Sequence, residues 1–170
     1  MADDFALVER SSLGLATVMA RKDISAADIG RALGMPMPDG PFESTGVDMS
    51  LLGTGPGSWL ALCEKPGEDW ADGLAAKLDG LASLSDQSGA YVVFRLGGAR
   101  ARRLLQQGVA LDLDPEVFPP HRVAVTMIAH IGVILWRCAA RDAFDVAIFR
   151  SFATSFRQWA TATAAHLIEA

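Results

Sequence analysis

The chain has 170 residues, 51% of them hydrophobic and 21% charged, and a formal net charge of −5. This length is typical of one domain, and the acidic balance argues against nucleic acid as a partner, since nucleic acid selects a basic face. The two cysteines, Cys63 and Cys138, are far apart and form no CxxC pair, which argues against a zinc site and fits a reducing cytoplasm.

The first third of the chain predicts a strand and a capped helix. Residues 1–13 are polar, carry no signal-peptide pattern and are predicted to be a loosely held lead-in. A short strand is expected over 15–20. Ser25 and Asp28 have the spacing of a capping box, which predicts a helix that ends at Gly34.

The next segment predicts a loop, a hairpin and a second helix. Proline and glycine mark 35–46 as a loop. Strands are expected over 47–52 and 58–64, joined by the run GTGPG. No Gly-Lys-Ser/Thr follows that run, so we interpret it as a hairpin turn rather than a phosphate loop. Pro66 is predicted to begin a helix that packs Trp70 into the core.

The stretch 86–114 organises the second half of the chain. Alternating apolar residues over 90–96 predict a half-buried strand, which a glycine pair ends. A short helix then places Leu104 and Leu105 on its apolar face. Its outer face carries Arg100, Arg102 and Arg103. We interpret that basic face as solvated, with an acidic partner surface as the alternative.

The last third predicts three strands and a long helix. The strands are expected over 122–129, 132–138 and 143–149, after a turn-rich crossover. Ser151 is predicted to cap the final helix. The most apolar window, 123–136, is shorter than the about 20 residues that span a membrane, so no membrane partner is expected.

The order of the predicted elements repeats along the chain. Residues 14–83 and residues 89–168 each give a strand, a helix, further strands and a longer helix. We therefore predict an α+β fold with duplicated strand-helix-strands-helix halves. The domain would span 1–170 as one unit built of two pseudo-repeats.

No set of reactive residues forms a catalytic constellation in the sequence. None of the histidines, serines or loop carboxylates is tied to a partner by spacing, and His130 is interpreted as a structural histidine rather than a ligand or base. Asp112 and Asp114 precede a proline and fit a turn. The other residues weighed are His121, His166, Ser58, Ser88 and Ser151. We predict no catalytic, cofactor-binding or metal site in this chain.

Several short segments, taken in order, resemble a known family. Asp86-Gln87-Ser88 precedes a strand that ends in FRLGG, and a leucine-rich helix and Leu111-Asp112-Leu113 follow. This order resembles the glycine-cleavage T-protein superfamily. A narrower resemblance, to the gamma subunit family of heterotetrameric sarcosine oxidase, rests on GPGSWL at 55–60, DLDPEVFPP at 112–120, Thr126, His130, Trp136 and FRSFATSFRQW at 149–159.

The resemblance implies a folate-binding-domain (T-protein-like) fold that serves as a subunit. Its partners would be the alpha, beta and delta subunits of a cytoplasmic complex that demethylates sarcosine to glycine and passes the one-carbon unit to tetrahydrofolate. FAD, FMN, NAD and tetrahydrofolate are expected in those partner subunits and none in this chain.

One strand departs from the pattern of the catalytic relatives. They carry one or two aspartates along it, whereas the corresponding run here ends in Trp136 and Arg137. An indole cannot transfer a proton near neutral pH. We therefore expect a non-catalytic structural subunit, with a stand-alone folate-binding or folate-dependent aminomethyltransferase-like protein as the alternative. The isolated chain is expected to self-associate through exposed aromatic side chains.

Overall fold

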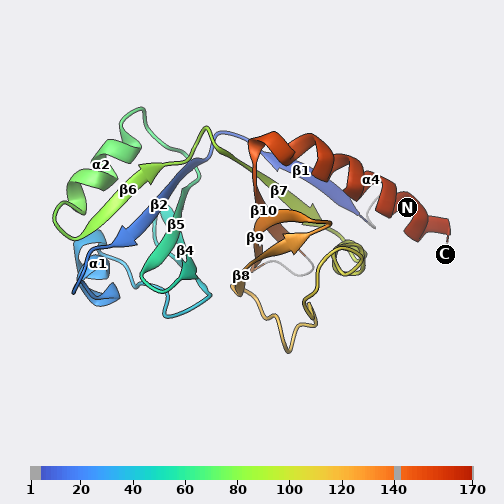
Figure 1. The fold of residues 1–170 in the computed structure, drawn as a ribbon, viewed down its shortest axis with the longest axis horizontal. Helices are drawn as coiled ribbons and strands as arrows, with labels where there is room; N and C mark the ends of the chain where they lie inside the picture. The colour runs from blue at the N-terminus through green and yellow to red at the C-terminus, as the bar shows by residue number, and fades with distance from the viewer. Residues whose placement is uncertain (1–4, 140–142, 170) are drawn as a thin grey trace. The chain divides into compact units, whose positions relative to one another are not determined.

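The computed structural model describes residues 5–139 and 143–169, which form two compact units (Figure 1). One unit comprises residues 11–89. The other combines the segment up to Arg10 with the segment from Ala90 onward. Each unit has one five-stranded sheet in which the paired strands run antiparallel.

The unit 11–89 has five strands and two helices, with the sheet order β3-β4-β5-β2-β6. Its elements are β2 (Gly14–Ala20), α1 (Ala26–Leu33), β3 (Glu43–Thr45), β4 (Met49–Gly55), β5 (Ser58–Cys63), α2 (Trp70–Lys77) and β6 (Ala82–Asp86). Buried side chains from the sheet and both helices, including Val18, Ile29, Trp59 and Leu74, form its core. Burying such side chains supplies the main driving force for folding.

The predicted capping box is confirmed at the start of α1. The Ser25 side chain accepts a hydrogen bond from the backbone N–H of Asp28, and the Asp28 carboxylate accepts one from the backbone N–H of Ser25. At the other end Gly34 has a φ of 68°, the left-handed conformation that glycine adopts without strain. Local sequence therefore determines both ends of this helix.

Three sequence predictions for this unit are wrong. The loop 35–46 contains β3, and the predicted elements omit β6. The second helix begins at Trp70 rather than Pro66, because residues 67–70 form a turn in which Trp70 N–H donates to Gly67 O. The GTGPG hairpin is confirmed, with Gly55 paired to Ser58.

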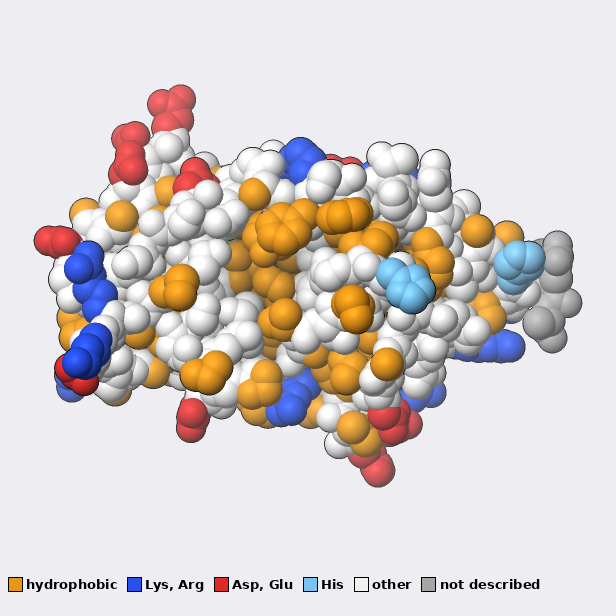
Figure 2. All heavy atoms as spheres, viewed as in Figure 1, with side chains coloured by type: hydrophobic (Ala, Val, Ile, Leu, Met, Phe, Trp, Pro, Cys, Tyr) orange, Lys and Arg blue, Asp and Glu red, His pale blue; other side chains and the backbone are white. Residues whose placement is uncertain are grey.

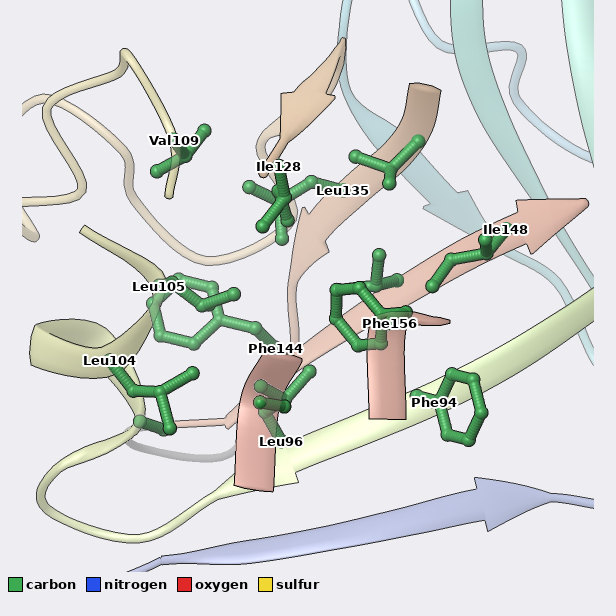
Figure 3. Close-up of a cluster of buried hydrophobic side chains, with 14 of the residues drawn as sticks. Phe94, Leu96, Leu104, Leu105, Val109, Ile128, Leu135, Phe144, Ile148 and Phe156 are labelled. Atoms are coloured by element: carbon green, nitrogen blue, oxygen red, sulfur yellow. The ribbon is translucent and has the colours of Figure 1, made fainter. Parts of the chain in front are cut away.

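The second unit has the sheet order β1-β7-β10-β9-β8. Its elements are β1 (Ala6–Arg10), β7 (Tyr91–Gly97), α3 (Ala101–Leu105), β8 (Val123–Ile128), β9 (Ile131–Arg137), β10 (Ala143–Phe149), a 3-10 turn η1 (Arg150–Phe152) and α4 (Ala153–Glu169). Figure 3 shows how Phe94 and Phe144 from the sheet, Leu104 from α3 and Phe156 from α4 meet in its core. The Phe94 and Phe156 rings stack at a centroid distance of 5.6 Å.

Two predictions for this unit are also wrong. The lead-in 1–13 contains β1, which pairs with β7 from Ala6↔Gly97 to Arg10↔Val93, while residues 1–4 lie outside the described residues. A distant strand supplies that pairing, so the local polarity gave no sign of it. Ser151 does not cap α4, because it lies within η1 and the helix starts at Ala153.

The strand orders of the two sheets correspond. Reading β3-β4-β5-β2-β6 against β8-β9-β10-β7-β1 matches the strands of the two units position by position. The fifth position differs in origin, since β6 follows α2 in one unit whereas β1 precedes the whole other unit in sequence. Within the described residues, no helix is both long and apolar enough to cross a membrane.

Candidate functional site: the buried Asp145 and its arginines

Asp145 on β10 is a fully buried carboxylate held by two guanidinium groups. Arg95 donates from Nε to Oδ1 and from Nη2 to Oδ2, each at 2.7 Å. Arg10 donates from Nη1 to Oδ2 at 2.6 Å. Asp145 has an exposed fraction of 0%, so the two arginines compensate a charge that water does not reach.

The sheet register brings these three residues together. Asp145 lies opposite Arg95 on β7, while β1 pairs with the other edge of β7 and brings Arg10 alongside. Side chains alternate between the faces of a strand, so Asp145 lies on the face opposite to the core residues Phe144 and Val146. The cluster thus ties three strands together on the side of the sheet that the α4 core does not use.

The chemistry of the cluster is that of an ion network rather than a proton relay. Both oxygens of Asp145 already accept hydrogen bonds, and its partners are guanidinium groups, which do not release a proton in the physiological range. General acid–base catalysis needs a group that can exchange a proton with a substrate. The arrangement can hold β1, β7 and β10 together. Its two arginines and one aspartate give it a net charge of one positive unit.

Sequence reasoning missed Asp145. The signal was a single carboxylate inside the otherwise apolar run AFDVAIF, where both faces of the strand are buried. A charge in such a run requires a partner. Its partners lie 50 and 135 residues away in sequence, so only the fold identifies them.

Trp136 and Arg137, the residues that depart from the catalytic relatives, are both buried. Trp136 lies directly opposite Asp145 in the register of β9 and β10. Arg137 donates from Nη1 to the carbonyl oxygens of Leu113, at 3.4 Å, and Phe118, at 3.1 Å. Arg137 therefore anchors the 113–118 segment to the sheet, which is a structural role.

The predicted turn at Asp112 and Asp114 is confirmed. The Asp114 N–H donates to Asp112 Oδ1 at 2.9 Å, and the Glu116 N–H donates to Asp114 Oδ1 at 3.0 Å. Arg102 also donates to Asp114 Oδ2 at 3.1 Å. The carboxylates thus order the loop that Arg137 holds.

Asp86 and Ser88 form a hydrogen-bonded pair in the unit 11–89, called here the Asp86–Ser88 lock. Asp86 Oδ1 accepts from the Ser88 N–H at 2.9 Å and from Ser88 Oγ at 2.7 Å, and these hydrogen bonds lower the pKa of Asp86. Ser88 Oγ in turn accepts from the Leu15 N–H at 3.0 Å. The D-x-S motif therefore fixes the chain after β6 to the start of β2.

The histidines lie on separate elements. His130 is exposed in the two-residue turn between β8 and β9, where Ala129 and His130 have φ values of 48° and 69°. His121 also has positive φ and donates its backbone N–H to Arg137 O, while His166 lies on α4. Over residues 5–139 and 143–169, no three His, Cys, Asp or Glu side chains gather as a metal site would require.

The remaining candidates are two serines and the two cysteines. Ser58 Oγ lies 3.4 Å from Thr54 Oγ1, and Ser151 is an exposed residue of η1. Cys63 and Cys138 are buried thiols that form no disulfide. A hollow of about 530 Å³ lies between the GTGPG turn and the 38–41 loop, with Trp59 at its wall. The Trp59 indole N–H donates to Pro38 O at 3.5 Å, and the one charged lining residue is Asp39.

The chain matches a family model described as "Sarcosine oxidase, gamma subunit family" over residues 19–166. It is similar to the sarcosine oxidase subunit gamma of Corynebacterium sp. (strain P-1), with 30% identity over 104 residues. That alignment covers 61% of this chain and 51% of the relative, so the chain aligns with about half the length of the curated relative.

Two solved structures share the fold. A chain of the heterotetrameric sarcosine oxidase from Corynebacterium sp. U-96 superposes with a TM-score of 0.85 at 23% identity, covering 95% of this chain and 84% of that one. The glycine cleavage system aminomethyltransferase T from Bartonella henselae gives a TM-score of 0.71 at 12% identity, covering 93% and 45%. These likenesses confirm the T-protein-like fold. Because the family model spans most of its length, the chain belongs to the sarcosine oxidase gamma subunit family.

Proposed function

We propose that this chain is the gamma subunit of a heterotetrameric sarcosine oxidase and serves it as a non-catalytic structural subunit. The family match over residues 19–166 carries this proposal. The engaged state of Asp145 supports the non-catalytic role, since both of its oxygens already accept hydrogen bonds from arginines. The complex would demethylate sarcosine to glycine and pass the one-carbon unit to tetrahydrofolate.

The partners in this proposal are the alpha, beta and delta subunits, in the cytoplasm. FAD, FMN, NAD and tetrahydrofolate would bind to those subunits and not to this chain. Within the chain, residues 14–83 and 89–168 would act as two pseudo-repeats of a single folate-binding-type domain spanning 1–170. The matching strand orders of the two units support that interpretation.

Exposed apolar side chains support a role in assembly. Figure 2 shows hydrophobic side chains (orange) at several places on one face of the molecule. Phe149 and Phe152 have exposed fractions of 49% and 47%, and the Phe149 ring stacks on Tyr91 at 4.7 Å. Aromatic side chains of this kind are enriched at protein interfaces.

Co-expression tests the proposal. The chain should co-elute with the alpha, beta and delta subunits in gel filtration, through a contact that buries more than about 1,200 Å² in total. Separate elution at micromolar concentrations would contradict the proposal. Calorimetry of the isolated chain with tetrahydrofolate is the second arm, since micromolar binding would favour the stand-alone folate-dependent alternative.

A further inference from the structure

Four strands form the edges of the two sheets, namely β1, β8, β3 and β6. An edge strand exposes unpaired backbone groups, and proteins protect such strands with charges, short length or covering segments. β3 has only three residues, and β6 exposes Ser83, Ser85 and Asp86. β1 carries Glu9, which pairs with Arg157 at 2.7 Å, and Arg10. These three edges are protected.

β8 lacks the first two of these protections. Its six residues, VAVTMI, include no charged residue and no proline. Val125 and Met127 have exposed fractions of 61% and 62%, although both are large and apolar. Both side chains point to the same face because they are two residues apart. β8 therefore presents an uncharged edge with an apolar stripe beside it.

Among the described residues, the backbone contacts on the outer side of β8 gather at one end. Another segment reaches its outer side at one end, where Val109 bridges to Ile128 and the Ala129 N–H donates to Gly108 O at 3.0 Å. Backbone groups alternate between the two sides of a strand. Since Ala129 directs its N–H to the outer side, the N–H groups of Met127 and Val125 are directed there as well.

We propose that β8 receives an extended strand from another subunit of the oxidase, so that the sheet continues across the interface; this inference rests on the proposed function. The absence of charge on β8 matches an uncharged strand with apolar side chains at alternate positions. The backbone edge would supply affinity, and Val125 and Met127 would supply specificity.

The length of the edge argues for a larger partner rather than a second copy of this chain. The open part, residues 123–127, spans about 17 Å at about 3.4 Å per residue. Two such edges would pair along a strip only that long, whereas a specific stable interface buries about 1,200 Å² or more in total. A larger subunit can add one strand here and extend the contact over neighbouring surface.

The experiment uses the full chain co-expressed with the alpha, beta and delta subunits. Val125→Lys places a charge on the stripe, and Val125→Pro removes an outward N–H. Val117→Lys is the matched control, because Val117 is a valine of similar exposure (57%) in the same unit and lies outside the strands. Circular dichroism of each variant checks that it folds. We expect at least a tenfold loss of affinity for both Val125 variants and none for the control.

Hydrogen exchange gives an independent readout on the unmodified chain. The amides of Val125 and Met127 should exchange more slowly in the complex than in the isolated chain. If the wild type assembles and both Val125 variants assemble equally well, the β8 inference alone is overturned. Failure of the wild type to assemble would overturn the proposed function and this inference with it. If the isolated chain forms a homodimer and Val125→Lys dissociates it, the partner of β8 is a second copy of this chain, and the choice of another subunit is overturned.

Discussion

Asp145 and Trp136 face each other directly across β10 and β9. The tryptophan that stands where the resemblance leads one to expect an acid thus has a carboxylate as its cross-strand neighbour. That carboxylate is engaged by Arg95 and Arg10 through both of its oxygens. The case for a non-catalytic chain therefore rests on how the acid is bound, rather than on the lack of one.

Replacing Asp145 by alanine should destabilise the protein strongly. Removing one partner of a buried ion pair costs about 3–5 kcal/mol, because it leaves charge uncompensated. We expect the lower end of that range, since the Arg95 side chain is 46% exposed and can reach water. Urea unfolding measures the loss.

Asp114→Asn is the matched control for this measurement. The side chains of Asp114 and its partner Arg102 are partly exposed, at 49% and 41%. A surface pair of this kind contributes at most about 1 kcal/mol. Equal losses of unfolding free energy for the Asp145 and Asp114 substitutions would show that the buried cluster contributes no more to stability than a surface ion pair.

Replacing Arg137 by methionine should release the 113–118 segment. The substitution keeps an apolar stem and removes the donors to Leu113 O and Phe118 O, and hydrogen bonds of charged groups contribute about 1.5–3 kcal/mol each. Amide exchange over residues 111–120 should accelerate by at least tenfold. Arg103→Met, at an exposed position of α3, should leave that exchange unchanged.

The Asp86–Ser88 lock should weaken in acid. The hydrogen bonds from Ser88 lower the pKa of Asp86 in the folded state below its ordinary value of 3.8. The unfolded state therefore binds the proton more readily, so this stabilisation is present above about pH 4 and is lost as pH falls through the lower folded pKa.

Asp86→Asn should reveal that loss. The difference in free energy of unfolding between the wild type and Asp86→Asn should shrink between pH 6 and pH 3. In a Ser88→Ala background, which lacks the hydroxyl donor, the pH dependence of that difference should be smaller. A difference that stays constant with pH in the wild-type background would contradict this account.

Gly53→Ala should be far more harmful than Gly55→Ala, although both lie on β4. A Cβ at Gly53 would lie 1.9 Å from Gly40 O, which is backbone and cannot rotate away, whereas a Cβ at Gly55 would meet no atom within 4 Å. Overpacking of this kind costs about 1–3 kcal/mol or more. Thermal unfolding of the two variants checks the contrast, and comparable melting temperatures would show that the 38–41 loop yields easily.

Local signals predicted well what local contacts determine. Ser25, Asp28 and Gly34 specify α1 within a single turn at each end, and the apolar alternation located β8, β9 and β10 to within one or two residues. The repeated order of elements was also visible, since each repeat carries its own strand and helix signals.

Features that depend on distant partners could not be predicted in the same way. β1 has five mostly exposed residues, ALVER, without a clear alternation, and its pairing with β7 makes it a strand. Asp145 was hidden for the same reason, because its arginines come from β1 and β7. The D-x-S motif is visible in the sequence as a family feature. Its hydrogen bond to Leu15 is seen only in the structure.

The origin of β1 has a consequence for how the protein is made. β1 is synthesised before every other described strand, yet its neighbour β7 begins at Tyr91, after the whole 11–89 unit. During translation β1 therefore stays unpaired until β7 has been synthesised. Its charged residues Glu9 and Arg10 favour a solvated state during that time. Deleting β1 would therefore destabilise the unit that is synthesised last, because β7 would lose its pairing partner on that edge.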